Sequence, residues 1–218
     1  MIFHDIMITQ GLLMETKTIP RRERQKIAQH QEMLDAALEL FSAKGYHNVS
    51  MHEIAAKAEF AIGTLYKFFS NKEDLYKALI LGLSDRFHKV LSEAIESAGD
   101  EIEKLRYYVQ AKGEVFRDKA ATIRLYFAET RGASFNIMTG LDQDIRNRRE
   151  RFLQQLAEIF ESGIRSGRFH PIAEPYILAV TLDSLCNAFL FLWLENPEKH
   201  SYPEDPDTIL NIIFKGLI

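Results

Sequence analysis

The chain has 218 residues, of which 46% are hydrophobic and 27% are charged, and it contains one cysteine. This composition is typical of a globular protein, and it excludes a disordered chain, a collagen-like fibre and a small scaffold stapled by disulfides. A single cysteine cannot form an intrachain disulfide, which suits a reducing compartment, so we expect a cytoplasmic protein. The net charge of −4 excludes a uniformly basic coat, yet residues 17–77 hold ten basic against eight acidic side chains. This mildly basic segment hints at a polyanionic partner.

The pattern of apolar residues predicts an all-α fold of about nine helices. No stretch alternates with a period of two, whereas apolar residues recur at helical spacing along most of the chain. Residues 1–19 are expected to be a flexible extension without the basic segment of a signal peptide, and its methionines offer alternative start sites at Met1, Met7 and Met14. We expect helices at residues 20–43, 51–58, 62–69, from 71 onward, 100–118, 120–131, 142–166, 175–196 and 205–217, with loops at 132–140 and 196–206.

Several helix ends carry capping signals. Gly45 follows the first helix in the position of a C-terminal cap, and Ser50 with Glu53 has the spacing of a capping box. Asn71 is placed to cap the long fourth helix, while Pro175 suits the first turn of the helix at residues 175–196. We expect a first domain at residues 20–70 and a second at residues 71–218.

The segment Ile177–Leu194 is apolar on nearly every face. Asp183 and Asn187 lie at its centre, where a lipid bilayer would penalise them by several kcal/mol, so we expect no membrane span. An apolar helix in a soluble chain is buried between partners. Together with residues 205–217, this segment is therefore expected to form a hydrophobic homodimer interface of two helices from each subunit.

The segment 50–69 has the form of a helix-turn-helix. Two short helices flank a tight turn, and in such a unit the second helix enters the major groove of DNA. Leu65 and Phe69 are four residues apart and can face the core, so the intervening polar side chains point outward. A helix-turn-helix pattern also occurs in many all-α proteins, in which Tyr66 and Phe68 would belong to the core.

The motifs around this segment resemble the N-terminal domain of TetR-family transcriptional regulators. The matching stretches are 41–46, 50–55, 63–69 and 71–75, and the resemblance extends over about residues 24–80. It implies a homodimer that binds a palindromic operator, most often as a repressor, and releases it when a small molecule binds to the second domain. Residues 71–218 would then form the ligand-binding and dimerisation domain.

The resemblance also assigns roles to residues. Ser50 matches a helix cap that contacts phosphate, Thr64, Tyr66 and Lys67 match DNA-facing positions, and Lys72 matches a phosphate-contacting lysine. From the residues themselves, Gly63 allows close approach of a phosphate, Ile62 suits a thymine methyl group, and Arg24 belongs to a basic segment that can reach the DNA backbone. The expected DNA-binding set is therefore Arg24, Ser50, Ile62, Gly63, Thr64, Tyr66, Lys67 and Lys72.

Two positions depart from the family pattern. Glu59 stands where the turn usually has a glycine, so a positive φ would be strained there and an acidic group would lie near the DNA. Ala61 stands where the recognition helix usually begins with serine or threonine, so that cap and its phosphate contact are lost.

The second domain is rich in aromatic residues, as expected either for an ordinary core or for an apolar ligand pocket between helices. A few polar side chains are embedded in the same segments, where buried ion pairs are an equally good explanation. A basic run at residues 146–151 is read as a solvated face, or alternatively as a docking site for an anionic head group. The pocket is expected to take a lipophilic effector with an acidic group, and its candidate residues are Tyr107, Arg124, Phe127, Arg131, Phe152, Asp183 and Asn187.

Motifs of catalysis are missing from the sequence. There is no nucleotide-binding glycine loop and no serine-hydrolase elbow, and His52-Glu53 lacks the second histidine of a zinc protease motif. We therefore expect a regulator rather than an enzyme, with no cofactor and no metal. The alternative is a helical small-molecule-binding or catalytic protein whose helix-turn-helix is only structural; the two differ in the salt dependence of DNA binding.

Overall fold

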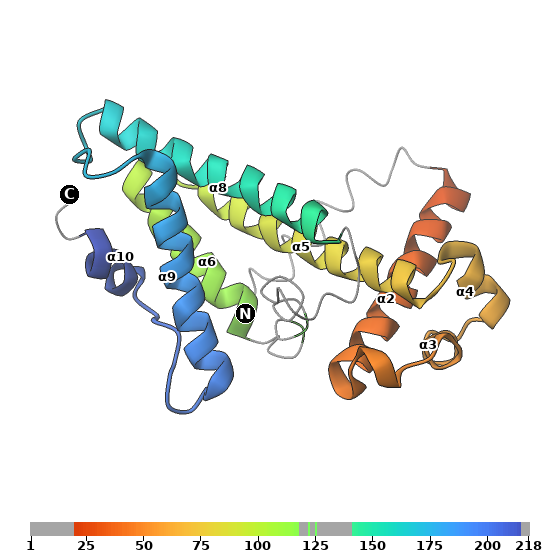
Figure 1. Ribbon diagram of the computed structural model, residues 1–218. Coiled ribbons are helices and arrows are strands. Elements are labelled where there is room, and N and C mark those ends of the chain that lie inside the picture. Colours follow the sequence, from red (N-terminus) through yellow and green to blue (C-terminus); the bar gives the residue numbers. More distant parts are fainter. Residues whose placement is uncertain (1–19, 118–121, 123–124, 126–140, 215–218) are drawn as a thin grey trace. The chain divides into compact units, whose positions relative to one another are not determined.

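The computed structural model describes residues 20–117, 122, 125 and 141–214 (Figure 1). Within these residues the chain forms eight α-helices and one short 3-10 turn, and it has no β-strand. The elements are α2 (Arg21–Lys44), η1 (Tyr46–Asn48), α3 (Met51–Lys57), α4 (Ile62–Phe68), α5 (Lys72–Glu96), α6 (Glu101–Arg117), α8 (Leu141–Arg165), α9 (Pro175–Glu195) and α10 (Pro206–Phe214). The all-α prediction is confirmed. The predicted extension 1–19, most of the predicted helix 120–131 and the predicted loop 132–140 lie outside the described residues.

The chain divides into two compact units, residues 1–76 and residues 77–218. Helix α5 begins in the first unit and continues into the second. Each unit has buried apolar residues of its own, which is the physical basis of an independent core.

Unit 1 is built from α2, α3, α4 and the start of α5. Its core holds a cluster of three aromatic rings, in which Tyr76 lies 5.3 Å from Phe41 and 4.8 Å from Tyr46 between ring centroids. Gly45 ends α2 with φ 76°, in the left-handed region that glycine adopts without a Cβ clash, and η1 follows directly. The chain thereby turns sharply enough for α3 to pack on α2.

Unit 2 is a bundle of α5, α6, α8, α9 and α10 around a second core (Figure 1). The core is filled by buried side chains from each of these helices, among them Leu91, Tyr108, Leu156, Leu182 and Ile209. Helix α9 is long and apolar enough to cross a membrane by length and composition alone. It packs against α8 and α6, however, and seven of its residues are buried, as in the core helix of a globular bundle.

The predicted helix ends are confirmed where the structure describes them. Asn71 accepts a hydrogen bond from the backbone N–H of Asp74 at 2.7 Å, and Asp100 caps α6 through the N–H of Glu103 at 2.9 Å. Pro175 occupies the first turn of α9. These caps satisfy N–H groups that have no partner within their own helix.

Candidate nucleic-acid interface and the Asp183 cluster

Helix α3 begins with the capping box expected from the sequence. The Ser50 hydroxyl accepts a hydrogen bond from the Glu53 N–H at 3.2 Å, and the Glu53 carboxylate accepts one from the Ser50 N–H at 2.8 Å. Lys44 of α2 donates a further bond to Glu53 at 2.9 Å. The bond from Lys44, followed by those from Ser50, lowers the pKa of Glu53 to about 2, so this carboxylate is ionised at neutral pH.

The turn between α3 and α4 is a Schellman motif with glutamate in the glycine position. Phe60 donates its N–H to the Ala55 carbonyl at 2.9 Å, and Glu59 donates to Ala56 at 3.1 Å. Glu59 has φ 59°, the one positive φ of a non-glycine residue in the described chain. The expected strain at this position is confirmed. Helix α4 then begins at Ile62, and its N-cap residue Ala61 provides no side-chain hydrogen bond, as also expected.

Helix α4 has one buried face and one open face. Leu65 and Phe69 are buried in the core of unit 1, as predicted from their spacing. Tyr66 is 49% exposed, and Gly63 and Lys67 are also exposed. Of the remaining candidates for DNA contact, Ile62 and Thr64 are half-buried at the border between the two faces.

Lys72, at the start of α5, is bound within unit 1. Its ammonium donates to the backbone carbonyls of Tyr46 at 3.0 Å and Val49 at 2.9 Å, and it lies 4.3 Å from the centre of the Tyr46 ring. These contacts join α5 to the connection between α2 and α3. They could not be predicted from the sequence, because the partners are more than twenty residues away.

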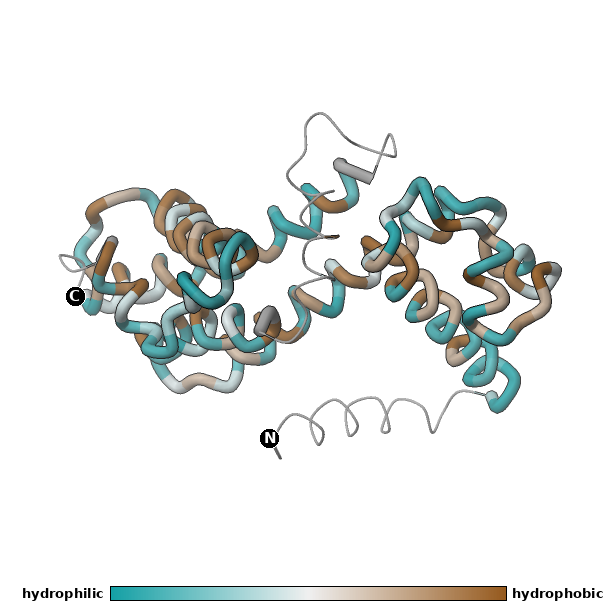
Figure 2. The backbone as a smooth tube through the Cα atoms, turned by 90° about the horizontal axis from the view of Figure 1, so that it is seen from below, coloured by the Kyte–Doolittle hydropathy of each residue, from teal (hydrophilic) through white to brown (hydrophobic). Residues whose placement is uncertain are grey.

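The first turns of α2 are hydrophilic (Figure 2). Arg24, the candidate from this segment, is exposed, as are its basic neighbours Arg21, Arg22 and Lys26. Several flexible cations at the start of unit 1 form a surface to which phosphates are attracted.

Unit 2 contains a polar cluster, the Asp183 cluster, which comprises the buried Tyr108, Lys112 and Asp183, the half-buried Asn187 and the exposed Arg149. The Asp183 carboxylate forms an ion pair with Lys112, whose side chain is 1% exposed. It accepts further hydrogen bonds from Tyr108 at 2.9 Å, Asn187 at 3.0 Å and Arg149 at 3.3 Å. Burial opposes ionisation of Asp183, but the Lys112 charge and the bonds from Lys112 and Tyr108 together hold its pKa below the ordinary value. The cluster thus joins α6, α8 and α9.

His88 of α5 lies beside this cluster. Its ring stacks on Phe152 with centroids 5.1 Å apart, and Phe152 in turn lies 5.8 Å from Tyr108. Burial, and then the nearby charge of Lys112, lowers the pKa of His88 to about 4, so the imidazole is neutral at neutral pH.

The structure therefore brings together some of the predicted pocket residues. Asp183 and Asn187 are bonded, and Phe152 lies next to them through Tyr108. Tyr107 is 42% exposed, because one residue along a helix turns a side chain by about 100° away from Tyr108. The other candidates, Arg124, Phe127 and Arg131, lie outside the described residues.

Lys112 and the polar role of the Tyr108 hydroxyl were not predicted from the sequence. A signal for both was present, since Leu105, Tyr108 and Lys112 share one helical face at spacings of three and four. A lysine on an apolar face calls for a buried partner. In the part of the chain that the structure describes, no group of histidine, cysteine and acidic residues could hold a metal ion.

A helix-turn-helix unit followed by a larger helical unit defines a class of bacterial transcriptional regulators. Residues 33–79 match the family model for bacterial regulatory proteins of the tetR family, and residues 98–216 match the model for the tetracyclin repressor-like C-terminal domain. The chain belongs to the tetR family. It is accordingly a DNA-binding regulator of the kind that responds to small molecules.

Known proteins of similar length resemble the chain over most of their sequence. The fatty acid metabolism regulator protein of Bacillus subtilis is 22% identical over 194 residues, which cover 89% of this chain and 98% of the relative. The transcriptional repressor KstR2 of Mycobacterium tuberculosis is 24% identical over 140 residues, covering 64% and 68%. The crystal structure of FadR from Bacillus subtilis in complex with stearoyl-CoA has a TM-score of 0.73 at 23% identity, covering 86% of this chain and 99% of that one. This last likeness shows a shared fold.

Proposed function

We propose that the protein is a repressor that binds a palindromic operator as a homodimer and releases it when a small lipophilic molecule binds to unit 2. The observation that carries the DNA-binding role is the open face of α4, with Gly63, Tyr66 and Lys67 exposed opposite the buried Leu65 and Phe69. This is the arrangement in which a recognition helix enters the major groove. The protein acts in the cytoplasm, where the chromosome of a bacterium lies, and it acts by binding rather than as an enzyme.

The DNA-contacting set of the proposal is Arg24, Ser50, Ile62, Gly63, Thr64, Tyr66, Lys67 and Lys72. Exposed Lys67 and Tyr66 reach base edges or phosphates, while the glycine lets the backbone of α4 come close to the duplex. The half-buried Ile62 and Thr64 contribute from the border of the face. Lys72 keeps its place at the start of α5, and the phosphate contact assigned to it must coexist with its two carbonyl bonds.

A substitution of Gly63 tests this role with little interference from folding. A Cβ at this position would meet nothing within 4 Å in the free protein. Gly63→Ala is therefore expected to keep or raise stability, by up to about 1 kcal/mol, because alanine favours helix. It should weaken DNA binding by about tenfold, since the added methyl group holds the helix away from phosphate.

The measurement is fluorescence anisotropy on a fragment chosen from genomic DNA by repeated selection at low salt. The matched control is Gly82→Ala on α5, where a Cβ also meets nothing within 4 Å. The proposal fails if the wild-type protein selects no fragment, or if Gly63→Ala and Gly82→Ala bind the fragment equally well. Wild-type affinity should fall steeply between about 50 mM and 200 mM salt through release of counterions. Salt-independent binding would favour the alternative of a purely structural helix-turn-helix.

One relative supports small-molecule binding, and a second supports the role of repressor. FadR of Bacillus subtilis was crystallised with stearoyl-CoA, and KstR2 is named as a repressor. In this chain, the stack of His88 on the buried Phe152 lies beside the Asp183 cluster, so apolar and polar side chains are close together inside unit 2. A ligand that binds the DNA-free state better must, by linkage, bind less well in the presence of operator, by the same factor. Equal affinity with and without operator would contradict release.

The homodimer is proposed to form through residues 177–194 and 205–217. In unit 2, Ile177 and Leu192 of α9 and Ile212 of α10 are exposed large apolar side chains. Between the two α9 residues, Ser184 and Ala188 continue the same exposed face at helical spacing. Small residues in the middle of an apolar face allow two helices to approach closely, and a second copy of the same face is self-complementary about a two-fold axis.

The dimer is tested by sedimentation velocity at micromolar concentration. Ala188→Glu places a charge in the middle of the proposed interface and should convert the dimer to monomer, because an unpaired buried charge is costly. Val90→Glu replaces an exposed apolar residue of α5 and should leave the dimer intact. A monomeric wild-type protein, or a dimer unaffected by Ala188→Glu, would rule out this interface.

A further inference from the structure

The Asp183 cluster contains more positive than negative charge. Lys112 and Arg149 are cationic, and Asp183 is the single carboxylate bonded to them. The neighbouring His88 is neutral at neutral pH, and Glu150, the next residue on α8, accepts a hydrogen bond from the Tyr176 hydroxyl at 2.6 Å. A buried ion pair adds little stability compared with apolar residues of similar size. The second cation of the cluster, Arg149, is 53% exposed, so its charge is accessible to a ligand from solvent.

Most of the unused hydrogen-bond donors of the cluster belong to Arg149, and Asn187 bonds Asp183 through one of its two amide N–H groups. Both carboxylate oxygens of Asp183 already accept two bonds each, and the Lys112 ammonium is bonded to Asp183 and, at 2.9 Å, to Tyr108. Arg149 uses one N–H, at 3.3 Å, of the five that a guanidinium carries, and its side chain is 53% exposed. The exposed donors of the cluster are thus those of the Arg149 guanidinium, which bind an acceptor group, while both oxygens of its one carboxylate are already occupied.

The neighbouring basic residue on α8 has a different carboxylate partner. Arg148 forms two bonds to Asp85, at 2.6 and 3.2 Å. Its charge is thereby matched by a carboxylate of its own. Arg149, by contrast, shares the carboxylate of Asp183 with a fully buried lysine.

We propose that Arg149, backed by the buried Lys112–Asp183 pair, is the binding site for one anionic group of the effector. This inference rests on the proposed ligand response and specifies its chemistry: an apolar molecule that ends in a single carboxylate or phosphate. The anion takes the unused donors of Arg149, and its charge neutralises the cluster. To contact Phe152 and His88, which pack beside the cluster, the apolar part of the effector must enter the core of unit 2, because Phe152 is only 6% exposed.

The experiment compares three probes that share one chain: decanoate, decyl phosphate and 1-decanol, titrated below their micelle concentrations by calorimetry. We expect the wild-type protein to bind at least one of the anions about tenfold tighter than the alcohol, as a charge-assisted hydrogen bond provides. A comparison of decanoate with decyl phosphate shows whether the site prefers a carboxylate or a phosphate. Equal binding of all three probes, or no binding of either anion at millimolar concentration, would overturn the proposal.

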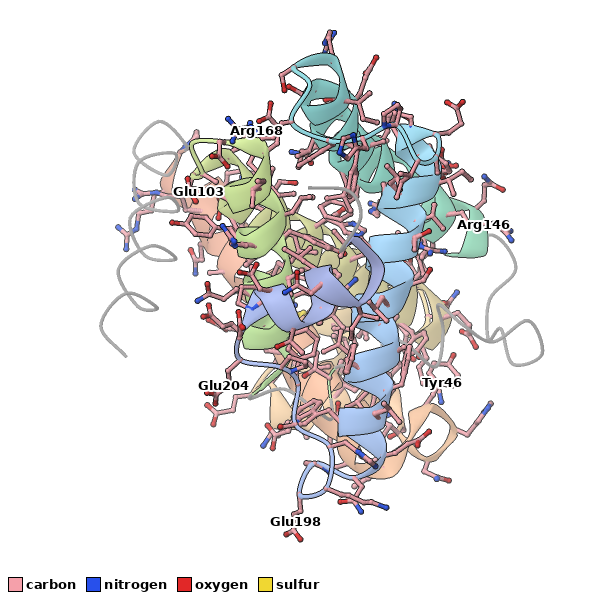
Figure 3. All side chains as sticks on the ribbon, turned by 90° about the vertical axis from the view of Figure 1, so that its left-hand side faces the viewer. Tyr46, Glu103, Arg146, Arg168, Glu198 and Glu204 are labelled. Carbon is pink, nitrogen blue, oxygen red and sulfur yellow. The ribbon has the colours of Figure 1, made fainter. Side chains whose placement is uncertain are left out.

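Substitutions of Arg149 test whether this residue causes the preference for an anion. Arg149→Gln should weaken anion binding about tenfold and leave 1-decanol within twofold, whereas Arg149→Lys should retain part of the preference. The matched control is Arg165→Gln, an exposed arginine at the far end of α8, about 24 Å away by helical rise. Arg146 points away from the body of unit 2 (Figure 3), so Arg146→Gln provides a second control on the near end. An unchanged anion preference in Arg149→Gln would refute the assignment.

Failure of the proposed anion site can be distinguished from failure of the proposed function. DNA binding by Arg149→Gln, measured by anisotropy without any probe, should equal that of the wild-type protein. If DNA binding is normal and some ligand releases it, but Arg149→Gln does not alter the anion preference, only the anion site fails. If no DNA is bound, the proposed function fails while calorimetry still decides the site.

Discussion

The ammonium of Lys72 lies 4.3 Å from the centre of the Tyr46 ring and donates a hydrogen bond to the carbonyl of the same tyrosine at 3.0 Å. The second bond, to the Val49 carbonyl, completes a contact between the start of α5 and the end of η1. A lysine that the family resemblance assigns to phosphate binding therefore also stabilises the fold of unit 1. Effects of its substitution on DNA binding must be separated from effects on stability.

Lys72→Met is expected to lower the free energy of unfolding by about 1–3 kcal/mol, because two carbonyls lose a charged donor. Lys67→Met should change stability by less than about 0.5 kcal/mol, since Lys67 is exposed on α4. Urea unfolding followed by circular dichroism measures both. Equal stability of the two variants would show that the contacts of Lys72 contribute nothing to folding.

Glu59→Gly is expected to stabilise the protein by up to about 1 kcal/mol. The left-handed conformation at φ 59° costs a residue with a Cβ roughly 1–2 kcal/mol. Glycine avoids this cost, but part of the gain is offset because glycine loses more conformational entropy on folding. Glu59→Ala keeps the Cβ and should give no such gain, so it is the control for loss of the charge. A rise in thermal midpoint for alanine as large as that for glycine would contradict this explanation.

Two helical glycines are expected to respond to alanine in opposite ways. At Gly113 of α6, a Cβ would lie 2.5 Å from the ring of Tyr202, whose hydroxyl donates to the Val109 carbonyl at 3.0 Å. Gly113→Ala should therefore displace that ring and destabilise the protein by about 1–3 kcal/mol. Gly82→Ala on α5 meets nothing within 4 Å and should stabilise by up to about 1 kcal/mol. Urea unfolding measures both effects: a lower midpoint for Gly113→Ala and a higher one for Gly82→Ala, with unchanged dependence of the unfolding free energy on denaturant, would confirm the prediction.

Acidification is expected to destabilise the protein partly through His88. Its pKa falls from 6.5 to about 4 in the folded state, so the unfolded chain binds more protons in this range. Stability is then fully present above about pH 6.5 and is lost as the pH falls toward 4, with a slope of at most about 1.4 kcal/mol per pH unit.

The check is urea unfolding at a series of pH values for the wild-type protein, His88→Phe and the exposed control His52→Gln. His88→Phe keeps a ring against Phe152 and should flatten the slope, while His52→Gln should not. Burial also lowers the pKa of His30, so a smaller slope remains in His88→Phe. An unchanged slope in His88→Phe would show that this histidine is not the titrating group.

Local features of the fold were predictable from the sequence. The capping box of Ser50 and Glu53, the glycine cap at Gly45 and the strained turn at Glu59 each involve residues within about five positions of one another. The burial of Leu65 and Phe69 follows from helical periodicity on the short helix α4. Such features depend on the geometry of one helix turn, which the chain itself determines.

Contacts between distant residues were decided by the tertiary structure. Lys112 and Asp183 are 71 residues apart, and Lys72 and Tyr46 are 26 apart, so no helical period relates them. Whether Asp183 would face lipid, solvent or a partner depended on how α9 packs against α6 and α8. Charged side chains are buried only where a partner compensates the loss of water, and that partner is supplied by the packing of helices rather than by the order of residues in any one of them.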